Sequence, residues 1–200
     1  MDSKRYSTNA WALSRRTGRG RVSINLEGHG REEVLDGVDL SHTVGWFTSI
    51  FPVALDIAAS DEPNWRDLIK SVRRQLRAIP GNGFGFGALR YLGSPVTREQ
   101  LSANEQGPQI AFNYLGQWDA RSQDEERSLY WATHSSIGQE RDPAERNGHL
   151  LEVVGEVSNG QLRFSWYYGT DLQYATVQTV ADDFVDALRR IARDCREVML

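Results

Sequence analysis

The pair Asn159-Gly160 is the feature that most constrains the fold of this 200-residue chain. It lies between two strand-like runs, residues 150–157 and 161–168, which are rich in β-branched and aromatic residues. Both positions of an Asn-Gly pair tolerate positive φ, which a tight hairpin turn requires. We therefore predict an antiparallel hairpin in this part of the chain.

Further strands are predicted where apolar and polar residues alternate. Val22, Ile24 and Leu26 alternate with three polar residues, the last of which is Glu27, and this is the period of a half-buried strand. Glu27 is therefore expected on the polar face. Residues 51–57 and 109–114 also predict strands.

Helices are predicted from residues that recur at a spacing of three or four. Residues 64–79 form one such segment, with Asn64 as N-cap, and 97–103 form a short one. A C-terminal helix over 174–198 has a regular apolar face, made of Val177, Val180, Phe184, Leu188 and Ile191. Strands and helices thus mix without strict alternation, which favours an α/β sandwich with a mixed sheet.

The two ends of the pattern are less regular. Residues 9–16 predict the last turns of a helix that ends at Thr17-Gly18. We expect the first turns of this helix to belong to a sequence that is absent here. We therefore separate residues 1–20, this incomplete helix and a basic turn, from the main unit over 21–200. Residues 119–148 are polar and turn-rich, and we expect a long surface excursion there.

Composition excludes several classes of protein. A net charge of −4 argues against nucleic-acid binding, and we interpret the basic cluster from Arg15 to Arg21 as a solvated turn. No apolar run approaches the length of a membrane span, and the N-terminus has no secretory signal. The single cysteine, Cys195, cannot form an internal disulfide, which agrees with a cytoplasmic location.

The segment from Glu27 to Glu32 carries the most chemical information. Gly28 and Gly30 bracket His29 where a strand ends, and glycines there allow a sharp turn or the close approach of a ligand. Glu27 is a candidate general base. A metal held by His29 and Glu32 would match no familiar spacing of ligands, so we expect none.

Three further segments bear unusual residues. Asp39 to Val53 is dense in aromatic and small residues, including Trp46, and predicts a packed turn that lines a cleft. Pro80 to Gly87 holds many glycines, but it lacks the Gly-Lys-Ser/Thr ending of a phosphate loop and a suitably spaced helix after it. Asn113 interrupts an apolar strand, so it either braces the backbone or faces a ligand.

In this order, the four segments resemble the motifs of epimerization domains of nonribosomal peptide synthetases, over roughly residues 9–196. The matching stretches are Glu27 to Glu32, His42 to Thr48 with Pro52-Val53, Pro80 to Gly87, and Phe112 to Gly116. The chain departs from the family pattern at two places, with His42 in place of Arg and Phe86 in place of Tyr. Losing a cation and a hydroxyl there could weaken substrate positioning.

The resemblance implies a fold like the C-terminal subdomain of a chloramphenicol-acetyltransferase-like condensation or epimerization domain. The superfamily's His-His-x-x-x-Asp motif belongs to the other half, and no two histidines are adjacent in this chain. The implied activity is the conversion of an L- to a D-aminoacyl or peptidyl thioester, carried on the phosphopantetheine arm of a carrier protein. The resemblance implies no cofactor bound covalently to the chain itself.

The resemblance also assigns the site. Glu27 would be one of two acid/base groups, and the second would come from a complementary N-terminal half, so the chain alone is expected to be inactive. The substrate channel would be lined by Asn113, Tyr114, His29, Trp46 and Phe86. Asn113 could donate a hydrogen bond to the thioester or its enolate oxygen.

Two alternatives remain open. The chain could be a non-catalytic remnant that binds a carrier protein or the complementary half, or a condensation-type acyltransferase, although that chemistry also normally needs the absent histidine. Because the apolar face that meets the other half would be exposed, self-association is also expected.

Overall fold

A five-stranded mixed sheet organises the part of the chain that the computed structural model describes, residues 3–32, 36–57, 60–102, 107–117, 148–158 and 160–197. Its spatial order is β2-β1-β3-β4-β5. The strands are β1 (Arg21–Gly28), β2 (Ser49–Asp56), β3 (Ile110–Gln117), β4 (Leu151–Ser158) and β5 (Gln161–Tyr168).

The pairing of the strands explains why the sheet is mixed. β1 runs antiparallel to β2 and parallel to β3, while β3 runs parallel to β4 and β4 antiparallel to β5. The β4–β5 pair is the predicted hairpin, with Ser158 opposite Gln161 and a positive φ of 68° at Gly160. The hairpin, the mixed sheet and the α/β class are therefore confirmed.

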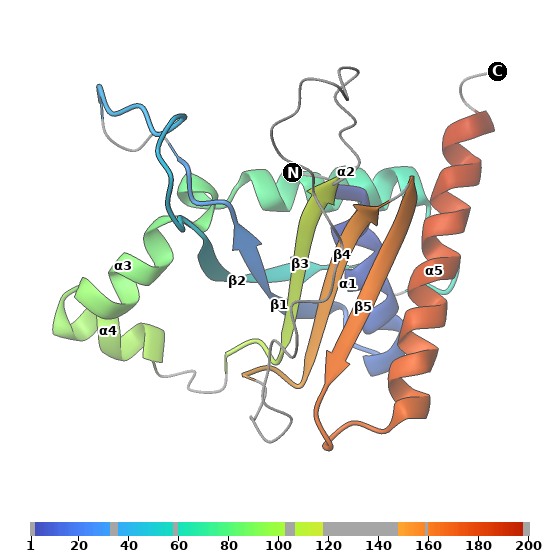
Figure 1. Ribbon diagram of the computed structural model, residues 1–200. Coiled ribbons are helices and arrows are strands. Elements are labelled where there is room, and N and C mark those ends of the chain that lie inside the picture. The colour runs from blue at the N-terminus through green and yellow to red at the C-terminus, as the bar shows by residue number, and fades with distance from the viewer. Residues whose placement is uncertain are drawn as a thin grey trace, which may run out of the picture.

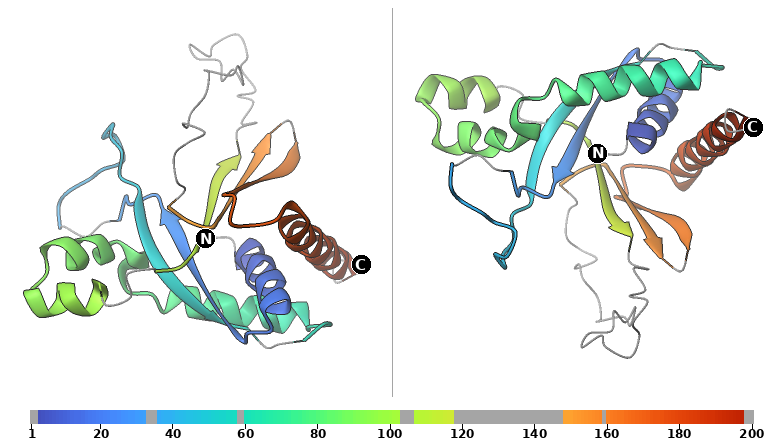
Figure 2. Two further views of the ribbon diagram at one scale, coloured as in Figure 1. Left: turned by 90° about the horizontal axis from the view of Figure 1, so that it is seen from below. Right: turned by 90° about the horizontal axis from the view of Figure 1, so that it is seen from above.

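Helices cover one face of this sheet (Figures 1 and 2). These are α1 (Ser3–Thr17), α2 (Trp65–Arg77) and α5 (Tyr174–Glu197). A second group, consisting of the 3₁₀ helix η1 (Pro80–Gly83), α3 (Gly85–Leu92) and α4 (Pro95–Ser102), projects from the β2 edge (Figure 1). Within the described residues, the sheet consequently has a helix-covered face and an open face.

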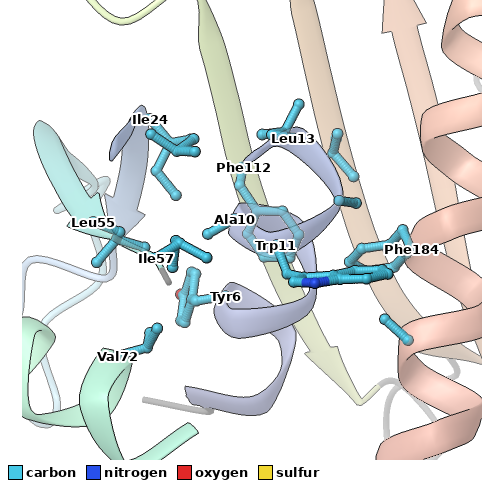
Figure 3. Packing of buried hydrophobic residues seen from close by; sticks show 14 of the residues in the cluster. Tyr6, Ala10, Trp11, Leu13, Ile24, Leu55, Ile57, Val72, Phe112 and Phe184 are labelled. Atoms are coloured by element: carbon cyan, nitrogen blue, oxygen red, sulfur yellow. The ribbon is translucent and has the colours of Figure 1, made fainter. Parts of the chain in front are cut away.

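Helix α1 lies at the centre of the core. Tyr6 packs edge-on against Phe112 of β3 with ring centroids 5.2 Å apart, and Trp11 packs against Trp65 of α2 at 5.1 Å. On the other side of α1, Phe184 of α5 completes the cluster (Figure 3). Residues 3–17 therefore share one core with the rest of the chain.

The predicted start of this helix, residue 9, is wrong. The helix already includes Ser3, although its predicted end at Thr17 is confirmed and Gly18 follows with φ 66°. Ser7, Thr8 and Asn9 favour caps and turns in isolation, yet all three are buried in the helix. Packing of Tyr6 and Ala10 overrides that local preference.

Local signals located the other long helices correctly. Asn64 caps α2, where its Oδ1 accepts a hydrogen bond from the Asp67 N–H at 3.2 Å. The predicted residues of the α5 apolar face, including Phe184 and Ile191, lie in or against the core. The predicted strand 51–57 corresponds to β2, and the predicted strand 109–114 to β3.

The basic turn after α1 is exposed, as predicted, but two of its residues also tie α1 to α5. Arg15 Nη1 donates to Asp183 Oδ1 at 3.0 Å, and Arg16 Nε donates to Asp183 Oδ2 at 2.6 Å. Asp183 is only 9% exposed. Its carboxylate is therefore a polar contact at the edge of the core.

The predicted surface excursion over 119–148 lies outside the described residues except for Gly148, and so does the side chain of Cys195. Among the helices that the structure describes, none combines the length and the hydropathy needed to cross a membrane.

Candidate functional site

Glu27 and Asn113 form a hydrogen-bonded pair on the open face of the sheet. Asn25 and Leu26 of β1 lie opposite Ala111 and Phe112 of β3 in parallel register. The next residue of each strand therefore points away from the buried Leu26 and Phe112. There, Asn113 Nδ2 donates to Glu27 Oε2 at 2.6 Å, and both residues are half-buried. Hydrogen bonds to a charged acceptor are shorter than those between neutral groups, in agreement with this short distance.

Tyr114, the next predicted channel residue, lies on the opposite face from Asn113. It packs against the core, and the Arg5 guanidinium lies 3.4 Å from the centre of its ring. Of these two neighbours, the structure therefore brings only Asn113 to Glu27. Alternation along a strand separates them, although both belong to one motif.

The segment after Glu27 holds the aromatic turn. Gly30 has φ 67°, and a Cβ placed there would lie 1.5 Å from the Phe47 carbonyl oxygen, so only glycine fits. Arg31 lies over the Phe47 ring at 4.4 Å and donates to the Leu40 carbonyl at 2.7 Å. The first and second motifs are thus in direct contact.

The same segment also meets the glycine-rich motif. Asn82 Nδ2 donates to Glu32 Oε2 at 2.9 Å. Gly83, at φ 81°, lies against Phe51 of β2 so closely that an added Cβ would be 2.2 Å from its ring. Residues 27–32 therefore contact each of the other three motifs.

A short helix that the sequence pattern did not predict begins in the glycine-rich segment. This helix, α3, follows the 3₁₀ turn and starts at Gly85. Gly85 and Gly87 lower the helical propensity of this stretch, so its local sequence gives no signal for a helix. Contacts of α3 with β2 and α4 outweigh that preference.

His29 and Trp46, two further predicted channel residues, lie on the surface of the molecule. His29 is exposed, and its Nδ1 accepts a hydrogen bond from the Arg31 N–H at 3.2 Å. Trp46 is 92% exposed and Val44 is 100% exposed, so the prediction of a packed turn is wrong for these residues. Phe47, held by Arg31, is partly covered.

Phe86 packs against the core and lines a cavity of about 410 Å³. We call it the Arg90 cavity. It lies between β1, β2, the α3–α4 pair and the segments that precede β3 and β4, and its polar lining residues are Asn25, Arg90, Gln100 and His149. Asn25 Nδ2 and His149 Nε2 are 2.8 Å apart, which joins β1 to the start of β4.

Sequence reasoning missed most of this cavity. Asn25 was placed on the polar face with Glu27, but nothing local connects it to His149, which is 124 residues away. Arg90 lies on the unpredicted helix α3. The only sequence signal for the cavity is that Asn25 lies on the same face of a predicted strand as Glu27.

Comparisons with known proteins identify the family. The family model of the condensation domain matches residues 7–199. The chain therefore belongs to the condensation-domain family.

Several synthases contain a segment that is similar to this chain. It is 38% identical over 185 residues to surfactin synthase subunit 1 of Bacillus subtilis (strain 168), covering 92% of this chain and 5% of that protein. It is 37% identical over 181 residues to bacitracin synthase 3 of Bacillus licheniformis, covering 90% of this chain and 3% of that protein. The chain spans only a small part of these relatives.

Among solved structures, the epimerization domain from the third module of tyrocidine synthetase B superposes with a TM-score of 0.80 and 30% sequence identity. The match covers 98% of this chain and 42% of that one. The starter condensation domain of rhizomide synthetase shares the fold, with a TM-score of 0.60 and 14% identity. The fold is thus the mixed α/β arrangement of condensation and epimerization domains.

Proposed function

We propose that this chain is the C-terminal part of an epimerization domain, which inverts the α-carbon of an aminoacyl or peptidyl thioester on a carrier protein. One observation carries the proposal: the Glu27 carboxylate lies on the open face of the sheet and accepts a 2.6 Å hydrogen bond from Asn113. The similarity to a solved epimerization domain supports it.

The chemistry requires two groups on opposite sides of the α-carbon. The thioester carbonyl acidifies the α-hydrogen, so a carboxylate oxygen of Glu27 can remove the proton and leave an enolate. An acid on the other side then returns a proton to the opposite face, and the configuration is inverted. A carboxylate has about four lone-pair sites, so the bond from Asn113 leaves capacity for the proton.

Asn113 has two roles in this proposal. One N–H of its amide donates to Glu27 Oε2 and fixes the carboxylate against the sheet. The amide has a second N–H, which we assign to the enolate oxygen, where negative charge develops. Asn113 thus connects the base to the group that stabilises the intermediate.

The second acid/base group lies on another segment in this proposal. The family's His-His-x-x-x-Asp motif would supply it, and no two histidines of this chain are adjacent. The complementary half would cover the open face together with the exposed apolar side chains of Trp46 and Val44. The 200 residues alone are then inactive.

Deuterium uptake at the α-carbon of a carrier-bound aminoacyl thioester tests the proposal. We expect no uptake with the chain alone and clear uptake when the N-terminal half of an epimerization domain is added. Uptake by the chain alone would overturn the two-part site. Binding of the carrier and of the added half without uptake would instead support a non-catalytic interaction module.

A further inference from the structure

The Arg90 cavity lies close to the proposed reaction centre. Asn25 lines it and shares the open face of β1 with Glu27, two residues further along the strand. Two residues of a strand span about 7 Å. A group bound in the cavity therefore lies within reach of a substrate whose α-carbon is at Glu27.

The lining of the cavity is suited to an anion. Its described lining residues include the Arg90 guanidinium, the His149 imidazole and the amides of Asn25 and Gln100, and none of them is acidic. Phe86 adds half-buried apolar surface beside these polar groups. A partly exposed site with this lining is suited to a negatively charged or acceptor-rich group.

Arg90 lacks an acidic partner within the residues that the structure describes. Its guanidinium carbon lies 5.8 Å from the centre of the Tyr91 ring. Arg90 is half-buried, so water solvates it only in part. A planar guanidinium in this position matches a carboxylate or a phosphate through two parallel hydrogen bonds.

We infer that the Arg90 cavity receives the side-chain carboxylate of an acidic aminoacyl residue, which makes this part of the chain a determinant of substrate choice. The inference rests on the proposed function, because Glu27 fixes where the α-carbon lies. A side-chain carboxylate is two or three bonds from that carbon. The phosphate of the carrier's arm lies at the far end of a long chain of bonds, so the side chain is the better match.

Calorimetric titration of the 200-residue chain tests the cavity directly. The probes are the α-amides of N-acetylaspartate and N-acetylasparagine, which have nearly the same shape and differ in side-chain charge. We expect the aspartate derivative to bind at least about tenfold more tightly, because it gains a charge-assisted pair with Arg90.

Two variants and one competitor complete the test. Arg90→Gln should lower the affinity for the aspartate derivative about tenfold or more, whereas Arg98→Gln, on the exposed surface of α4, should leave it unchanged. Equal binding of the two amides, or an Arg90→Gln variant that binds as well as the original chain, would overturn the inference. So would a site that inorganic phosphate fills but the aspartate derivative does not, since that result would assign the cavity to the arm.

The inference and the proposed function can fail separately. Glu27-dependent deuterium uptake without any preference for acidic substrates would support the proposed epimerase activity and contradict the proposed role of the Arg90 cavity. Arg90-dependent binding of the aspartate derivative without Glu27-dependent uptake would support the Arg90 cavity as an anion site and contradict the proposed epimerase activity.

Discussion

The helix-covered face and the open face of the sheet use neighbouring residues of the same strands for opposite purposes. On β1, Leu26 is fully buried under the helices while Glu27 is half-exposed on the other side. On β3, Phe112 and Asn113 repeat this division. The comparison shows how one sheet separates stability from chemistry, because successive side chains of a strand point to opposite faces.

The covered face gives the largest expected effect on stability. Phe112 is 1% exposed and contacts the rings of Tyr6 and Phe164. Phe112→Ala should lower the free energy of unfolding by about 3–5 kcal/mol, because it leaves a cavity among packed rings. Urea denaturation followed by circular dichroism measures this change. A loss below about 1 kcal/mol would contradict the assignment of this face to the core.

The adjacent residue should behave in the opposite way. Asn113→Ala should lower the free energy of unfolding by less, about 1.5–3 kcal/mol, the net value of a hydrogen bond to a charged group. It should slow α-proton exchange in the reconstituted domain more than it weakens binding of the carrier protein. Exchange at the original rate together with lost binding would show that Asn113 serves docking and not the reaction.

A charged contact at the edge of the covered face should matter less than the rings. Asp183→Asn removes the acceptor of Arg15 and Arg16 and should cost about 1–2 kcal/mol, since both arginines remain partly hydrated. Asp186→Asn is the matched control on the exposed side of α5, with an expected change within about 0.5 kcal/mol. Thermal unfolding of the two variants side by side measures the difference, and equal losses would contradict it.

The smallest effect concerns the loop before β2. The Ser41 N–H donates to Asp39 Oδ1 at 2.8 Å, and this bond together with the Ser41 side chain lowers the pKa of Asp39. The stabilisation of this turn is therefore complete above the ordinary pKa of an aspartate and is lost as pH falls through the lowered pKa. The Ser41 amide chemical shift should follow that acid transition. Asp39→Asn should abolish it, and a persistent transition in that variant would assign it elsewhere.

Features with local causes could be predicted from the sequence. The hairpin at Gly160 follows from turn chemistry, and α2 follows from its apolar period and the Asn64 cap. The start of α1 and the whole of α3 could not be predicted in this way. Ser7 to Asn9 and Gly85 with Gly87 are poor helix formers, and only packing against distant segments makes them helical.

The candidate site also contains residues that the sequence predicts and contacts that it does not predict. The sequence predicts both Glu27 and Asn113 as site residues. Their contact, however, depends on the register of β1 against β3, which no local sequence pattern specifies. Tyr114 belongs to the same motif as Asn113 and yet faces the core. His149 has no sequence signal at all, because its partner Asn25 is 124 residues away.

The central claim is that the Glu27 carboxylate exchanges the α-proton of a carrier-bound substrate. Its most direct test is the rate of α-deuterium uptake in the domain reconstituted with Glu27→Gln. We expect this rate to fall about 100-fold to 10,000-fold, the usual contribution of a positioned acid/base group, while the free energy of unfolding stays nearly constant. Uptake at the original rate in a folded Glu27→Gln domain would contradict the claim.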